Sequence, residues 1–300
     1  MPDDQARIVI IGGGAIGCSI AYHLALAGES DVLLLEKSQL THGSTWHAAG
    51  LVGQLRSKRN LTRLMQNSVK VFDRLKADTG QETEWKKVGS LRLAASDARF
   101  SEIKRTLTQA KSFGFEAHLI SPSEAEALFP YIEKKGVVAA AYIPSDGQID
   151  PYSLTQAYAK GARQRGIRLL EGRRVTGFQC EGSRITKVLT NDGTISCELV
   201  VNSAGLWAKE IGELISIPIA SGVVEHQYMV SEKRIDIEDG LPTLRDPDAN
   251  FYLKPDVKSF AIGGWEDVKK HVAERGGSLA PARREGPHYD DRWGRPPTVA

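Results

Sequence analysis

A short apolar block that runs directly into a glycine-rich turn most constrains the fold of this chain. Residues 7–11 read RIVII, and GGGAIG follows at once at residues 12–17. The segment 18–27 is rich in Ala and Leu, and a second apolar block at 31–35 ends in Glu36. Short β-branched blocks are typical of buried parallel strands, and the Ala/Leu segment indicates a helix. The sequence therefore predicts a strand, a turn, a helix and a second strand.

Each glycine of the G-x-G-x-x-G pattern has its own physical task. We expect Gly12 to form the tight turn, Gly14 to let a pyrophosphate approach the backbone, and Gly17 to let the helix pack closely on the strand. The helix N-terminus offers N–H groups and a partial positive charge to phosphates. Glu36 follows roughly 20 positions later, where an acidic side chain can bind a ribose hydroxyl. The pattern predicts a dinucleotide site, and the acid at position 36 disfavours NADP.

The composition is that of an ordinary globular protein. Of the 300 residues, 41% are hydrophobic and 25% charged, and the net charge of +2 gives no reason to expect nucleic acid or a membrane surface as partner. No apolar run approaches the ~20 residues of a membrane-spanning helix. The 3 cysteines lack metal-ligand spacing, so we expect reduced thiols and no metal site. The first strand lies so near the start that we expect no signal peptide and a cytoplasmic location.

The rest of the chain alternates between helical and strand-like patterns. Helices are predicted from apolar spacing and start signals at 61–75, 97–113, 122 onward, 151–162 and 206–214. A hairpin is predicted at 85–95 around Gly89. Further strands are predicted at 137–143, 167–170, 174–179, 185–190, 195–202, 221–230, 251–253 and 259–263.

This order of elements predicts an α/β fold made of two interleaved domains. A Rossmann-type dinucleotide domain is expected from residues 1–84 and 143–217. A mixed α/β substrate domain is expected from residues 85–142 and 218–267. The stretch 268–300 is rich in Arg, Gly and Pro and has little apolar periodicity, which predicts an irregular or disordered tail.

Three stretches resemble one protein family. They are GSTWHAAGL at 43–51, VNSAGLWA at 201–208, and the pair EHQY at 225–228 and FYLK at 251–254. With them the chain resembles the FAD-dependent amine and amino-acid oxidoreductases related to D-amino-acid oxidase, in particular the dimethylglycine and sarcosine dehydrogenase branch. The resemblance implies that the dinucleotide is FAD and that the Rossmann-type domain is an FAD-binding domain.

The resemblance also implies roles for individual residues. His47 is similar in position to the histidine joined covalently to the flavin 8α-methyl in this branch. Val175 is expected to meet the adenine through its backbone, and Ala204 and Gly205 to approach the cofactor closely. His226 and Tyr252 are the substrate-side candidates, although a purely structural role is the alternative for each.

The activity that the resemblance implies is oxidation of the C–N bond of an N-methylglycine-type amine. Hydride would pass to a covalently bound flavin, and oxygen or an electron-transfer protein would accept the electrons. The substrate is then a small amine or amino acid. A histidine such as His226 suits proton removal from the amine near neutral pH, and Tyr252 could orient substrate or water. Arg56, Arg92 and Lys254 stay open as partners of a substrate carboxylate.

Two other classes of function stay open. Members of this family continue beyond the region of residues 263–266 to complete the FAD domain, and residues 268–300 do not resemble that continuation. We therefore expect the C-terminal part to be missing, which allows a catalytically silent or truncated flavin-binding or regulatory paralogue. The glycine pattern alone would also fit an NAD-dependent dehydrogenase.

Overall fold

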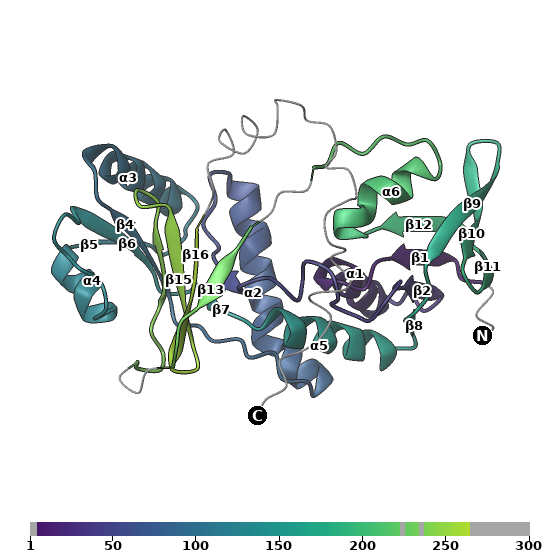
Figure 1. The fold of residues 1–300 in the computed structure, drawn as a ribbon, viewed down its shortest axis with the longest axis horizontal. Coiled ribbons are helices and arrows are strands. Elements are labelled where there is room, and N and C mark those ends of the chain that lie inside the picture. Colours follow the sequence, from purple (N-terminus) through teal and green to yellow (C-terminus); the bar gives the residue numbers. More distant parts are fainter. Residues whose placement is uncertain (1–4, 223–225, 234–236, 265–300) are drawn as a thin grey trace. The chain divides into compact units, whose positions relative to one another are not determined.

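The computed structural model describes residues 5–222, 226–233 and 237–264, which divide into two compact units (Figure 1). The first unit contains residues 5–46 and 166–222, and the second contains residues 47–165 and the described residues from 226 to 264. Parallel and antiparallel sheets both occur, so the predicted α/β class is confirmed. The tail predicted at 268–300 lies outside the described residues.

The compact units and the predicted domains are divided at different places. The boundaries between units fall after Trp46 and after Arg165. Residues 47–84 and 143–165 therefore pack with the second unit, whereas the sequence assigned them to the dinucleotide domain. Packing units need not coincide with the regions that hold a cofactor, and the predicted domain bounds stay a prediction.

A parallel sheet forms the centre of the first unit, and in the described part of the chain its strand order is β12-β1-β2-β8. These strands are β1 (Ile8–Ile11), β2 (Val32–Leu35), β8 (Arg168–Leu170) and β12 (Leu199–Asn202). Every residue of β1 and β2 is buried, as in parallel sheets covered on both faces. Helix α1 (Ala15–Leu26) contacts both strands. The predicted strand-turn-helix-strand order is confirmed, with the helix beginning before residue 18.

A small antiparallel sheet packs on this core. It consists of β9 (Val175–Glu181), β10 (Arg184–Thr190) and β11 (Gly193–Ser196). The single strand predicted at 195–202 is wrong, because the chain passes here from one sheet to the other. Cys197 N–H still donates to Thr186 O in the small sheet, whereas Leu199 N–H donates to Arg7 O beside β1. After β12 come a 3-10 turn, η1 (Gly205–Trp207), and helix α6 (Ala208–Glu213).

The second unit is built on a larger sheet. Within the described residues its strand order is β13-β16-β15-β14-β4-β6-β5, and β14 with β4 is a parallel pair. The strands are β4 (Ser90–Ala94), β5 (His118–Ile120), β6 (Ala139–Ile143), β13 (Tyr228–Val230), β14 (Thr243–Asp246), β15 (Phe251–Asp256) and β16 (Ser259–Gly264). A separate short pair joins β3 (Leu51–Val52) to β7 (Gly147–Gln148).

Helices pack on both faces of this sheet and beside it (Figure 1). Helix α3 (Asp97–Ser112) packs on Ala94 and Ala141, whereas α4 (Pro122–Leu128) packs in the cluster of Leu93 and Ala140 on the opposite face. Helix α4 begins at Pro122 as predicted, and a capping box of Ser121 and Glu124 starts it. Helices α2 (Arg59–Thr79) and α5 (Pro151–Arg163) contact each other.

Two predictions for the second unit are wrong. Residues 85–95 form no hairpin, because Lys86 pairs with Gln148 and only β4 joins the large sheet. Gly89 has a φ of +83° and donates its N–H to Asp146 O. It therefore bends the chain between Lys86, which pairs with Gln148, and β4, which joins the large sheet. Of the strand predicted at 221–230, only β13 is present, and residues 223–225 lie outside the described part.

Candidate functional site

The turn between β1 and α1 has no space for side chains at two of its positions. Gly12 has a φ of +111°, and a Cβ there would lie 2.4 Å from the carbonyl oxygen of Ser203. A Cβ at Gly17 would lie 1.9 Å from the carbonyl oxygen of Gly12. Because backbone atoms cannot move aside without distorting the sheet, both positions require glycine. The turn thus brings bare backbone to the N-terminus of α1, where N–H groups lack intrahelical partners.

The start of the GSTWHAAGL stretch contacts this turn. The hydroxyl of Thr45 accepts a hydrogen bond from Ala15 N–H at 3.0 Å. A Cβ at Gly14 would lie 3.1 Å from the same hydroxyl. Ile16, in the first turn of α1, is 68% exposed.

Glu36 connects the end of β2 to the glycine turn and to β9. Its Oε2 accepts from Gly13 N–H at 2.7 Å, and its Oε1 accepts from Ser38 N–H at 2.9 Å. Its own carbonyl oxygen accepts from Arg173 N–H at 2.8 Å. The segment that leads into the buried Val175 therefore lies beside Glu36.

The turn after β12 packs directly on the glycine turn. Ser203 donates from its N–H and its hydroxyl to Ile11 O, at 2.9 and 2.8 Å. A Cβ at Gly12 would lie 3.0 Å from Ala204 Cα, and Gly205 follows with a φ of +56°. The first unit thus contains all of the predicted cofactor-binding residues except His47: Gly12, Gly14, Gly17, Glu36, Val175, Ala204 and Gly205.

His47 is the first residue of the second unit. Its side chain is partly buried, with Nε2 shielded from solvent. The end of the same stretch is fixed by Gly50, which has a φ of +80° and accepts from Ile149 N–H at 3.0 Å. A Cβ at Gly50 would lie 2.0 Å from Ile149 O, so glycine is required there as well.

His226 and Tyr252 lie side by side in the second unit. His226 Nε2 is 3.3 Å from the Tyr252 hydroxyl, and the ring centroids are 6.0 Å apart. Tyr252 is only 5% exposed. Burial raises the pKa of the Tyr252 phenol, and Tyr228 adds to this, whereas Arg245 opposes it. The phenol is therefore neutral near pH 7 and can exchange a hydrogen bond with the imidazole.

Arg245 is a site candidate that the sequence analysis missed. It lies directly opposite Tyr252 in the β14–β15 pair and beside Arg92 in the β14–β4 pair. Directly opposed residues point to the same face of a sheet, so the three side chains share one face. The strand TLRD is short and has no alternating pattern, which is why its sequence gave no strand signal.

A cavity of about 100 Å³ lies in the second unit beside this arginine. Its charged lining consists of Arg56, Arg92, Asp146 and Arg245. Asp146 is 2% exposed, and its burial raises the pKa of its carboxyl, although hydrogen bonds from Ser90 and Gln54 oppose the rise. Lys254, one of the three cations considered from the sequence, is absent from this lining.

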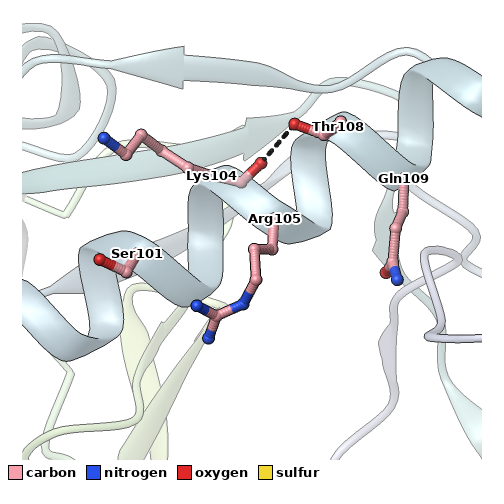
Figure 2. A pocket seen from close by; sticks show the side chains of 5 residues that line it. All are labelled: Ser101, Lys104, Arg105, Thr108 and Gln109. Atoms are coloured by element: carbon pink, nitrogen blue, oxygen red, sulfur yellow. Dashed lines mark hydrogen bonds between the residues drawn. The ribbon is translucent and has the colours of Figure 1, made fainter.

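A second, wider hollow lies on α3, and no buried charged side chain lines it. Figure 2 shows its lining residues, all from that one helix: Ser101, Lys104, Arg105, Thr108 and Gln109. All five are exposed, and the Thr108 hydroxyl donates to the carbonyl oxygen of Lys104 within the helix at 2.9 Å. This hollow is the solvent face of α3.

A family model described as FAD dependent oxidoreductase, of the type named DAO, matches residues 7–292. The chain belongs to this family of FAD-dependent oxidoreductases. The resemblance stated from the sequence is thereby confirmed, and NAD dependence has no support from the match. A bare turn that a Cβ would fill, next to an acid at the end of β2, fits a dinucleotide such as FAD.

Two relatives and one solved structure illustrate the family. Rat (Rattus norvegicus) dimethylglycine dehydrogenase is 40% identical over 270 residues, which cover 89% of this chain and 32% of that protein. Mouse (Mus musculus) sarcosine dehydrogenase is 35% identical over 267 residues, which cover 87% of this chain and 29% of that protein. L-proline dehydrogenase from P. horikoshii has a TM-score of 0.80 at 30% identity, covering 89% of this chain and 71% of that one.

The chain spans about a third of the length of these curated relatives. The activity of a whole relative is therefore not carried over directly. Among the described residues, no cluster of three His, Cys, Asp or Glu side chains could hold a metal ion. The described helices also include none with the length and apolar character needed to cross a membrane.

Proposed function

We propose that this FAD-dependent oxidoreductase oxidises the C–N bond of a small N-methylated amino acid of the dimethylglycine or sarcosine class. The observation that carries the proposal is the contact between His226 and Tyr252, two residues that the family resemblance assigned to the substrate side and that lie 3.3 Å apart. The 40% identity to a dimethylglycine dehydrogenase supports the substrate class.

In this proposal the first unit holds the cofactor. The turn from Gly12 to Gly17 and the N-terminus of α1 would hold the pyrophosphate, and Glu36 would bind the ribose. Val175, Ala204 and Gly205 would border the cofactor through backbone atoms. His47 would carry the covalent bond to the flavin. When bound, FAD supplies an acceptor for a hydride from the carbon next to the substrate nitrogen.

The second unit would handle the substrate. An amine must be unprotonated to lose hydride from its neighbouring carbon, and the His226 imidazole would take that proton as a general base. Tyr252 would orient the imidazole through the hydrogen bond between them. Water then hydrolyses the resulting iminium to an aldehyde and the shorter amine. Oxygen or an electron-transfer protein would reoxidise the cofactor.

The cytoplasmic location expected from the sequence stays a prediction.

The covalent bond is tested by acid denaturation of the purified protein followed by gel electrophoresis. Flavin fluorescence should stay with the polypeptide in the wild type and be absent from it in the His47→Ala variant. His42→Ala, in the same loop, is the matched control and should keep the fluorescence. Flavin that separates completely from wild-type protein would contradict the covalent bond but not the binding of FAD.

The substrate class is tested with dimethylglycine and sarcosine and an artificial electron acceptor, with formaldehyde as the measured product. His226→Ala should lower kcat/KM by roughly a hundredfold or more if the imidazole acts as the base. Unchanged turnover in His226→Ala would remove this role. Absence of turnover with both amines in flavin-loaded protein would contradict the proposed substrate class.

A further inference from the structure

The segment that follows His47 is held along its length by the region of β7. Ile149 N–H donates to Gly50 O at 3.0 Å. The β3–β7 pair continues this register over the next two residues. Beyond the pair, Gln54 N–H donates to the Asp146 carboxylate at 2.9 Å. The two segments therefore run antiparallel, and a side chain takes the place of the backbone acceptor at the far end.

The Asp146 side chain also ties this pair of segments to the large sheet. Its Oδ1 accepts from the backbone N–H and from Nε2 of Gln54, at 2.9 and 3.1 Å. Its Oδ2 accepts from the hydroxyl of Ser90, the first residue of β4, at 2.7 Å. Asp146 is 2% exposed and Gln54 is 3% exposed. Hydrogen bonds to a carboxylate are stronger than those between neutral groups, and burial protects them from competing water.

Two glycines let the strands pack closely at both edges of β7. A Cβ at Gly50 would lie 2.0 Å from Ile149 O, and a Cβ at Gly147 would lie 2.1 Å from Lys86 O. On this second edge, Lys86 and Gln148 exchange two backbone hydrogen bonds, at 2.9 and 3.0 Å. A shift by one residue would bring a Cβ against a carbonyl oxygen. The segment thus has a single register on β7.

The position of His47 follows from this register. His47 precedes Gly50 by three residues, and three residues of extended chain span at most about 10 Å. The His47 Nε2 is shielded from solvent, so the imidazole is packed within the protein. Contacts that fix Gly50 and the residues after it therefore limit where the imidazole can lie.

We propose that Asp146 is a positioning residue for His47, which fixes the segment at residues 47–54 through Gln54 and so holds the imidazole where it can bond to the flavin. This inference rests on the proposed function, which gives His47 that covalent bond. A bond forms rapidly only when the reacting atoms are held about 3–3.5 Å apart, and a displacement of about 1 Å can slow it roughly a hundredfold. In this role Asp146 acts through the backbone of β3.

The covalent fraction of the flavin measures whether His47 is in place. The purified chain is denatured in acid, and the flavin fluorescence on the polypeptide is compared with that of released flavin. Asp146→Ala should still bind FAD, but its covalent fraction should fall roughly tenfold below that of the wild type. Asp146→Asn keeps an acceptor for Gln54 N–H and should restore most of the covalent fraction.

Two further variants separate positioning from a general loss of stability. Ser121→Ala removes the capping box of α4 in the same unit and destabilises that helix away from the segment. It is the matched control and should keep the covalent fraction of the wild type. Ser90→Ala removes only one of the bonds to Asp146 and should lower the covalent fraction less than Asp146→Ala does, which keeps the test available if Asp146→Ala does not fold.

Hydrogen exchange measured by mass spectrometry reports on the segment itself, whether or not the flavin is bonded. The backbone amides of residues 50–54 should exchange roughly tenfold faster in Asp146→Ala, because hydrogen bonds to a charged group are lost. Those of α4 should exchange as in the wild type. A wild-type covalent fraction in Asp146→Ala, or unchanged exchange at residues 50–54, overturns the inference.

Failure of the proposed function gives a different result. Complete release of flavin from the wild type in acid contradicts the covalent bond at His47. The exchange rates at residues 50–54 then decide alone whether Asp146 fixes the segment.

Discussion

Gly263 lies directly opposite Tyr252 in the β15–β16 pair, and a Cβ at Gly263 would lie 2.3 Å from the Tyr252 hydroxyl oxygen. The phenol ring therefore occupies the space that any other residue at position 263 would fill. His226 meets the same hydroxyl at 3.3 Å. The absence of a side chain at Gly263 thus decides where the Tyr252 hydroxyl meets the imidazole.

Gly263→Ala should displace the Tyr252 ring while the fold persists, because the obstructing atoms belong to the far end of a side chain. We expect a loss of about 1–3 kcal/mol in unfolding free energy and a lower kcat for dimethylglycine. Denaturant unfolding and steady-state kinetics measure the two effects. Normal kcat in a folded Gly263→Ala protein would mean that the position of the ring is unimportant.

Tyr252→Phe removes the hydroxyl and keeps the ring that fills this space. We expect kcat/KM to fall about tenfold, since one hydrogen bond to the imidazole is lost, with little change in stability. Tyr142→Phe, in β6 of the same sheet, should leave the rate unchanged. If both glycine and tyrosine act through this contact, Gly263→Ala combined with Tyr252→Phe should cost less activity than the product of the single effects.

Gly17→Ala tests the glycine turn of the first unit. The new Cβ would lie 1.9 Å from Gly12 O, and relief requires α1 to move away from β1. We expect the unfolding free energy to fall by roughly 2–3 kcal/mol and flavin retention to be lost. Gly222→Ala, where nothing lies within 4 Å of the new Cβ, is the control. Full flavin content and wild-type stability in Gly17→Ala would show that close packing at this turn is not needed.

Asp146→Asn tests the cost of the buried carboxylate. Burial raises the pKa of Asp146 above its ordinary value of 3.8, so the folded protein binds this proton more tightly than the unfolded chain. The contribution of Asp146 to stability is therefore highest at low pH and falls as pH rises from about 4 through the raised pKa. The asparagine variant lacks this change, because it cannot ionise.

The melting temperature of Asp146→Asn relative to that of the wild type should therefore increase between about pH 4 and pH 7. The asparagine Oδ1 can still accept from Gln54 N–H, and its amide NH2 can donate to the Ser90 hydroxyl in place of the present bond, which limits any packing cost. Thermal unfolding of both proteins across this pH range measures the difference. A difference that stays constant with pH would mean that Asp146 has the same proton affinity in both states.

The sequence by itself determined the first unit up to Glu36. Its strand, turn, helix and second strand follow from short-range patterns, and the requirement for glycine at Gly17 comes from Gly12 in the same motif, whereas the space at Gly12 is closed by the distant Ser203. The start of α4 is likewise set by residues that are close in sequence, since Ser121 and Glu124 form its capping box. The family of FAD-dependent oxidoreductases could also be identified from the sequence, since contiguous stretches such as residues 43–51 carried the resemblance.

Only the tertiary structure decided which distant segments became neighbours. Residues 85–95 look like a hairpin, but Lys86 pairs with Gln148 and β4 pairs with β6 and β14. The strand that carries Arg245 gave no signal, because its place depends on partners far along the chain. Strand pairing is set by packing over long separations in sequence, and no local propensity encodes it. The sequence alone thus identified His226 and Tyr252 by resemblance. Arg245, which lies opposite Tyr252, could be identified only from the order of the strands.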